Sequence, residues 1–229
     1  MSKQGLRLGT LRFEVAFSYF YSMSVRTQHS YEKDWYITFT CFEWLPLFEM
    51  ANGYDLVYSW FDYLKVKDEA DILSYVIMPN HFHAIIHLRN EERNLNKLVA
   101  NGKRFMAYEI IKRLQLQSEE VSAGSSFRDP ALTIRILQRL AEGVSKTDKK
   151  KGQKHRVFEP SFDAKYVVSD KFVSQKLDYI HHNPVKGKWN LVDEFTDYEH
   201  SSASFYELGV VKHFKPRDYR EIWYPDEYN

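Results

Sequence analysis

Two histidines separated by one residue are the first side chains in this sequence that could do chemistry. His81 and His83 close the run Tyr-Val-Ile-Met-Pro-Asn-His-Phe-His at residues 75–83. Side chains of a β-strand alternate between its two faces, so a strand here would point both imidazoles to one side. Imidazole nitrogens are common ligands of divalent metals. With nine histidines in the chain, the same spacing also arises on an ordinary strand face, so this pair alone leaves both interpretations open.

A tyrosine and an asparagine about a hundred residues further on form the second reactive group. Tyr179 and Asn183 belong to the run Asp-Tyr-Ile-His-His-Asn-Pro-Val-Lys-Gly at residues 178–187. In a helix of 3.6 residues per turn they lie one turn apart and point to the same side. Pro184 disfavours helical geometry at the residue before it, which predicts that the helix ends near Asn183.

The two groups together indicate a tyrosine nucleophile that works beside a divalent cation. Two imidazoles and the amide oxygen of Asn183 would leave room on Mg²⁺ or Mn²⁺ for phosphate oxygens. A tyrosine hydroxyl can attack phosphorus and form a covalent intermediate. Attack by Tyr179 on a phosphodiester would retain a phosphoester, which would favour rejoining over hydrolysis.

The surrounding pattern predicts the elements that position these residues. Alternating aromatic and β-branched residues predict strands at 35–42, 72–78, 81–88 and 157–168, the middle two joined as a hairpin. Helical spacing predicts helices that begin near residues 54, 94, 131 and 170. The order strand, helix, strand, strand, helix, strand, helix favours an α+β ferredoxin-like sandwich, with an antiparallel sheet and its helices on one face.

The chain divides into three parts on these signals. Residues 1–34 are predicted to be an N-terminal extension, residues 35–192 the domain, and residues 193–229 a C-terminal tail. An insertion at about 116–156 interrupts the domain. It includes the basic tract 146–156, which contains no apolar residue. That composition predicts an exposed loop.

Composition excludes several classes of protein. The hydrophobic content of 44% and aromatic content of 16% over 229 residues are typical of a folded protein and exclude general disorder. The single cysteine, Cys41, excludes an internal disulfide and a cysteine-based zinc site. No run approaches the roughly 20 apolar residues of a membrane helix, and the N-terminus lacks the pattern of a signal peptide, so we expect a cytoplasmic protein without a membrane partner. The net charge of +1 shows no overall basic excess for nucleic acid.

The runs at 75–83 and 178–187 resemble those of the REP-associated tyrosine transposases, the chromosomal branch of the HUH single-strand transposases. The stretch Thr38–Thr40 and the run Leu-Pro-Leu-Phe at 45–48 resemble that family's opening, and the likeness extends over roughly residues 35–192. The stretch 115–156 is longer than is typical of the family. The segment 157–163 lacks the tryptophan and the acid–histidine pair expected there.

The resemblance implies a ferredoxin-like fold and a role for each matching residue. His81 and His83 match the metal-binding pair, Tyr179 matches the nucleophile, and Asn183 matches the third ligand. The implied activity is metal-dependent nicking and strand transfer on single-stranded or hairpin DNA, by a monomer or a homodimer. The implied intermediate is a 5′-phosphotyrosine with a free 3′-hydroxyl. Further candidate contacts to phosphate or DNA are Lys176, His87, Lys103, Arg104 and Lys186.

Two other functions fit the same residues. The protein could be a domesticated DNA-binding protein that recognises hairpins without cutting them. Alternatively, it could be a metal-dependent phosphodiesterase in which Tyr179 stacks on a base and forms no covalent bond. A Tyr179→Phe variant that still cut DNA would favour the phosphodiesterase.

Overall fold

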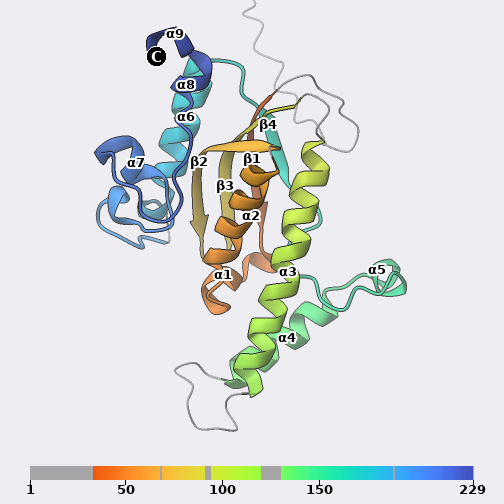
Figure 1. The fold of residues 1–229 in the computed structure, drawn as a ribbon. Coiled ribbons are helices and arrows are strands. Elements are labelled where there is room, and N and C mark those ends of the chain that lie inside the picture. Colours follow the sequence, from red (N-terminus) through yellow and green to blue (C-terminus); the bar gives the residue numbers. More distant parts are fainter. Residues whose placement is uncertain (1–32, 68, 91–93, 120–129, 188, 229) are drawn as a thin grey trace, which may run out of the picture.

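Four strands form one antiparallel sheet in the computed structural model, which describes residues 33–67, 69–90, 94–119, 130–187 and 189–228 (Figure 1). Nearly all of the predicted N-terminal extension, and part of the predicted insertion, lie outside these residues. The strands are β1 (Asp34–Thr40), β2 (Ala70–Met78), β3 (His81–Leu88) and β4 (Asp163–Tyr166). The helices are α1 (Leu47–Met50), α2 (Tyr54–Val66), α3 (Leu95–Glu119), α4 (Pro130–Glu142), α5 (Lys146–Lys150), α6 (Asp170–His181), α7 (Ala203–Leu208), α8 (Arg220–Trp223) and α9 (Pro225–Tyr228).

The strand order β2-β3-β1-β4, with α2 and α3 as the crossovers, is that of a ferredoxin-like α+β fold. β2 and β3 form the predicted hairpin around Pro79 and Asn80. β1 pairs with β3 in a register that places Thr38 opposite His83. The predicted fold class is therefore confirmed, although the fourth strand is shorter than the predicted range 157–168.

The helices cover both faces of the sheet, so the expectation that they lie on one face is wrong. α2 and α3 pack on the face that carries Ile37 and Phe82. α6 packs on the opposite face, where its Val173 and Ile180 contact a cluster that includes Tyr36. The sequence shows an apolar stripe on α6 but not which side of the sheet that stripe will cover. This face is also the one that carries His81 and His83, because residues 81, 83 and 85 share it.

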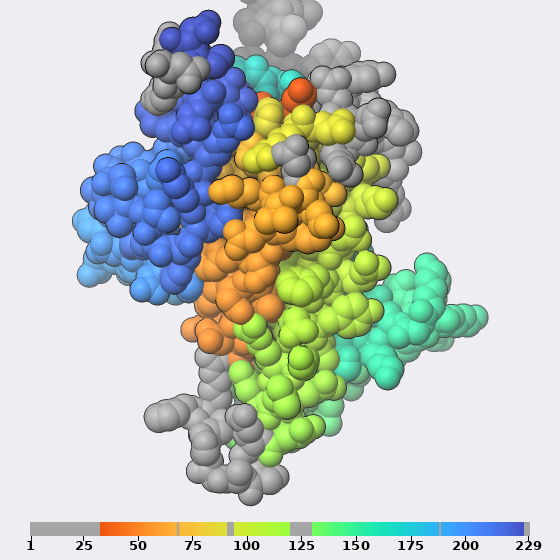
Figure 2. Space-filling model, in the orientation of Figure 1, coloured from red at the N-terminus to blue at the C-terminus, as the bar shows by residue number. Residues whose placement is uncertain are grey.

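The segment after residue 192 packs along the edge of β2. The amide of Ile77 donates to the carbonyl oxygen of His200 at 2.8 Å, and Ser201 forms an antiparallel bridge with Val76. Figure 2 shows this segment, in blue, lying directly against the sheet domain. The unpaired backbone N–H and C=O groups of an edge strand can pair with another chain and cause aggregation. The contacts of Ile77 and Val76 cover part of this edge. The residues predicted to form a tail thus take part in the fold.

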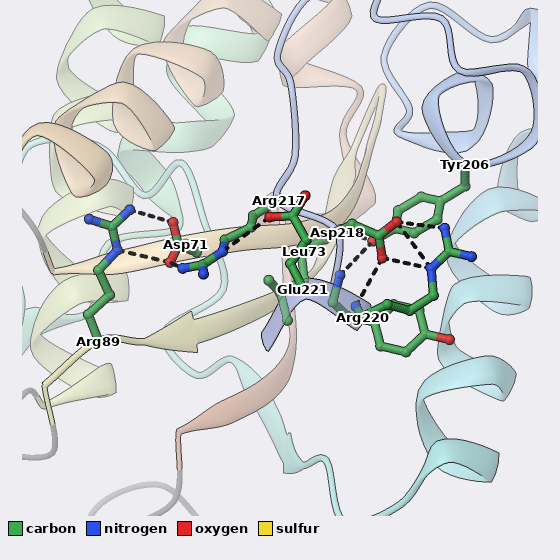
Figure 3. A network of polar contacts seen from close by, with 9 residues as sticks. Asp71, Leu73, Arg89, Tyr206, Arg217, Asp218, Arg220 and Glu221 are labelled. Carbon is green, nitrogen blue, oxygen red and sulfur yellow. Dashed lines mark hydrogen bonds and ion pairs between the residues drawn. The ribbon is translucent and has the colours of Figure 1, made fainter. Parts of the chain in front are cut away.

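An ion-pair network holds the C-terminal segment to the hairpin (Figure 3). Asp71 on β2 accepts hydrogen bonds from Arg89 at the end of β3 and from Arg217 of the C-terminal segment, both at 2.9 Å. Burial by itself would raise the pKa of Asp71, but the two guanidinium groups outweigh it and hold the pKa below its usual value. The ionised carboxylate of Asp71 therefore stabilises the folded state.

Replacing Asp71 with asparagine should destabilise the protein by about 2 kcal/mol at neutral pH, less than for a fully buried pair because the arginines are partly exposed. A carboxylate with a depressed pKa stabilises above the pKa of the unfolded chain and loses that effect as pH falls toward its folded pKa. The difference between wild type and Asp71→Asn should therefore shrink below about pH 4. Urea unfolding at pH 7 and pH 3 measures it, and an equal difference at both values would contradict the assignment.

The described part of the insertion contributes α4 and α5. α4 packs against α3, and Arg139 on α4 forms an ion pair with Glu43, just after β1. α5 is a short exposed helix inside the basic tract that was predicted to be a loop. Among the described residues, none of the helices has the length and apolar composition to cross a membrane.

Candidate metal and nucleophile site

A chain of hydrogen bonds fixes the ring of His81. The side-chain amide nitrogen of Asn80, Nδ2, donates to the carbonyl oxygen of Trp44 at 3.0 Å. This contact leaves the side-chain oxygen of Asn80 facing the imidazole of His81. That oxygen accepts from Nδ1 of His81 at 2.7 Å. Since an amide oxygen can only accept, Nδ1 carries the proton and the lone pair of His81 lies on Nε2. The neutral imidazole is thus prepared to bind a cation.

His83 is held in a similar way by two hydroxyl groups of β1. Its Nδ1 lies 2.6 Å from Oγ1 of Thr38 and 2.9 Å from the Tyr36 hydroxyl. A hydroxyl can accept as well as donate, so these contacts are compatible with a proton on Nδ1 and a lone pair on Nε2 of His83. This Nε2 is buried and has no hydrogen-bond partner among the described residues. A buried polar atom without a partner is unfavourable unless a ligand satisfies it.

Burial keeps both histidines neutral. It lowers the pKa of His81 to about 4, against a smaller opposing effect of the nearby Asn183 side chain. Burial, with the nearby His81 and Lys176, lowers the pKa of His83 well below its usual value. Metal ligation requires the neutral form of imidazole, so both rings suit a cation at neutral pH.

Asn183 follows α6 in the short 3₁₀ turn Asn183–Val185, while Tyr179 lies on α6 itself. The side chain of Ser169 caps this helix by accepting from the amide of Phe172 at 3.3 Å, and the helix ends at His181 as Pro184 predicts. The Tyr179 ring lies edge-to-face against His83, with 5.1 Å between ring centroids, and is 44% exposed. The tyrosine predicted to be the nucleophile is therefore exposed and adjacent to the histidine pair.

Lys176 is a further candidate contact that lies beside Tyr179. Its ammonium nitrogen lies 4.5 Å from the ring centre of Tyr36 and 5.7 Å from that of Tyr179. Partial burial, and to a smaller extent the charge of Lys165, lower the pKa of Lys176. A cation one helical turn before the tyrosine can attract a phosphate.

These residues fit the divalent cation that the sequence implies. Nε2 of His83 lacks a partner, Nε2 of His81 carries a lone pair, and the Asn183 side chain reaches His81. In the part of the chain that the structure describes, no group of three or more His, Cys, Asp or Glu residues could hold a metal. The donor set of two imidazoles and one amide would leave coordination positions for phosphate oxygens, as an open catalytic site requires.

The other four candidate contacts lie in different environments. His87 shares the face of His83 but lies four residues, roughly 13 Å, further along β3, and its Nδ1 contacts Asp34 at 2.9 Å. The ammonium of Lys103 donates to the carbonyl oxygen of Glu159 at 2.6 Å and so stabilises the fold. Arg104, on α3, contacts Asn101, away from the histidines. Lys186 lies 3.5 Å from Asp178, next to the nucleophile, and stays a candidate.

Three residues of the site were not identified from the sequence, namely Tyr36, Thr38 and Asn80. Tyr36 and Thr38 are two residues apart on β1, so strand alternation alone indicates that they share one face of the sheet. Their role depends on the register that pairs Thr38 with His83, and no local pattern specifies that register. Asn80 was assigned only to a turn. A fourth buried residue, His181, anchors the end of α6 through Ser202 Oγ at 3.0 Å.

Replacing Thr38 with valine should weaken metal binding by about 10- to 100-fold, because the group that orients His83 is lost while the volume is kept. Calorimetric titration with Mn²⁺ measures the affinity. Thr40→Val on the same strand and face is the matched control, since its side chain makes no recorded hydrogen bond to either histidine. Equal affinities of the two variants would show that Thr38 does not orient the ligand.

Comparisons with known proteins give one result. No protein-family model matches the chain, and no curated protein matches it. A solved structure described as a REP-associated tyrosine transposase bound to a REP hairpin is similar to this chain, with a TM-score of 0.49 and 16% sequence identity. The match covers 84% of this chain and 90% of that chain.

Proposed function

We propose that the protein is a metal-dependent nickase and strand transferase that acts on single-stranded or hairpin DNA through a covalent bond to Tyr179. One observation supports this most strongly. The exposed Tyr179 on α6 packs against His83, whose buried Nε2 has no partner among the described residues, while Asn183, in the 3₁₀ turn after α6, reaches His81. A nucleophile and three potential ligands, from elements about a hundred residues apart, thus converge.

The proposed step exchanges one phosphoester for another. The Tyr179 oxygen bonds to the scissile phosphorus, and the bond from phosphorus to the 3′-oxygen of the preceding nucleotide breaks. The proton lost from the Tyr179 hydroxyl is balanced by the proton gained by the leaving 3′-oxygen. A 5′-phosphotyrosine and a 3′-hydroxyl result. The reverse attack by another 3′-hydroxyl rejoins the DNA without ATP, which favours transfer over hydrolysis.

Each residue of the site has a part in this reaction. A bound Mg²⁺ or Mn²⁺ would polarise the scissile phosphate. His81, His83 and Asn183 would hold that cation, and Lys176 places a positive charge beside the Tyr179 ring, where it can attract the phosphate. The hydroxyls of Tyr36 and Thr38 fix the orientation of His83. Hairpin DNA is the substrate that the sequence resemblance implies, and an unpaired strand approaches an exposed tyrosine more closely than a duplex does.

The test is to incubate the protein with hairpin oligonucleotides from the region around its gene, with Mn²⁺, Mg²⁺ or a chelator. We expect a protein–DNA adduct on a denaturing gel with either metal and none with the chelator. Metal-dependent cleavage without an adduct, in reactions where religation is blocked, would contradict a covalent mechanism. Binding without cleavage on every repeat would indicate a protein that only recognises DNA.

A further inference from the structure

Trp44 is an exposed tryptophan at the border of the histidine site. Its side chain is 59% exposed, and its ring lies edge-to-face against His81 with 5.7 Å between centroids. Single exposed apolar residues are common on protein surfaces, so the exposure alone has no functional meaning. Two further observations distinguish Trp44, namely its backbone conformation and the contacts that hold it.

The backbone holds Trp44 in an unfavourable conformation. Glu43 and Trp44 have φ angles of 51° and 58°, in the left-handed region that residues other than glycine seldom occupy. Such strain persists only when surrounding contacts enforce it, and it is concentrated at functional sites. Here the enforcing contact is the Asn80 side chain, which donates to the Trp44 carbonyl oxygen and also orients His81. The position of the indole is thus tied to that of the metal ligand.

Residues of the insertion at 116–156 contact the segment 42–44 that carries Trp44. Arg139 on α4 forms an ion pair with Glu43, and the guanidinium of Arg156 lies 4.7 Å from the ring centre of Phe42. Gly143 lets the end of α4 approach Phe42, since a Cβ there would lie 2.5 Å from that ring. The positive charge of Arg139 also compensates the negative charge of Glu43, which would otherwise repel a phosphate beside Trp44.

We propose that the indole of Trp44 is a stacking platform for an unpaired nucleobase next to the phosphate held at His81 and His83. This inference rests on the proposed function for the identity of the ligand. Successive nucleotides of a stacked strand rise by roughly 3.4 Å along its axis, so a ring 5.7 Å from His81 is within about two nucleotides of the scissile phosphate. Stacking on an aromatic side chain tolerates any base, which suits a position that binds without reading sequence.

The test compares two probes without a metal, so that binding is measured apart from cleavage. One is an oligothymidylate of roughly twelve nucleotides, and the other is the same backbone without bases. Fluorescence anisotropy gives the dissociation constants of wild type and Trp44→Ala. We expect Trp44→Ala to bind oligothymidylate about tenfold more weakly and the abasic strand as wild type does. Trp44→Phe should recover most of the loss, because it restores an aromatic face.

The control is Tyr108→Ala, which removes an equally accessible aromatic side chain, 71% exposed, from α3. It should bind both probes as wild type does. Equal weakening of both probes by Trp44→Ala, or no weakening of either, would overturn the platform, as would an absence of wild-type binding to oligothymidylate. Adduct formation at Tyr179 is measured separately on hairpin DNA, so the platform and the proposed reaction can fail independently.

Discussion

Tyr179→Phe should abolish the covalent protein–DNA adduct and reduce cleavage by more than about a thousandfold. The substitution removes only the attacking oxygen. The phenyl ring can keep its edge-to-face contact with His83, so folding and metal binding should be retained. Denaturing gels measure the adduct, and urea unfolding measures the stability of each variant.

Tyr63→Phe provides a matched control, because Tyr63 is similarly exposed, at 50%, but lies on α2 across the sheet. It should form the adduct at the wild-type rate. Cleavage by Tyr179→Phe at a rate near that of Tyr63→Phe would exclude Tyr179 as the nucleophile and favour a phosphodiesterase that uses water.

His83→Ala should lower the rate of adduct formation by about a hundred- to a thousandfold, the size expected when Lewis-acid stabilisation of several kcal/mol is lost. His83 Nε2 is the donor that the fold leaves buried and without a recorded partner, so its removal should also weaken Mn²⁺ binding measured by calorimetry. Wild-type metal affinity in His83→Ala would contradict its assignment as a ligand.

His87→Ala tests the composition of the metal site on the same strand. His87 shares the face of His83, but its ring is turned to Asp34 and lies too far along β3 to bind the same cation. We expect His87→Ala to retain metal affinity and adduct formation close to wild type. A loss as large as that in His83→Ala would mean that the metal site extends further along the strand than the structure indicates.

The sequence was sufficient for features that depend on local periodicity. Alternation placed His81 and His83 on one face of a strand, and helical spacing placed Tyr179 on a helix, as the structure shows. Asn183, which the same spacing placed on that helix, lies just beyond its end in a 3₁₀ turn. The hairpin at Pro79 and the end of α6 before Pro184 also follow from local backbone preferences. The roles of these residues in metal binding and catalysis stay predictions.

Features that depend on packing between distant segments could not be predicted. The apolar stripe of α6 is evident in the sequence, but its position across the sheet from α2 and α3 arises from tertiary packing. The hydrogen-bond partners of His83 depend on the register between β1 and β3. The hydrogen bond from Lys103 to the carbonyl oxygen of Glu159 depends on the path of the loop before β4. The contact between Trp44 and His81 likewise depends on a pair of left-handed residues that no local pattern predicted.

Mass spectrometry of the adduct tests the central claim most directly. After nuclease treatment, trypsin should release residues 177–186, which lie between Lys176 and the bond after Lys186 and contain Tyr179 as their single tyrosine. We predict that this peptide carries the added mass of a 5′-linked nucleotide on Tyr179. A nucleotide on any other peptide, or cleaved DNA with no modified peptide when religation is blocked, would contradict the proposed mechanism.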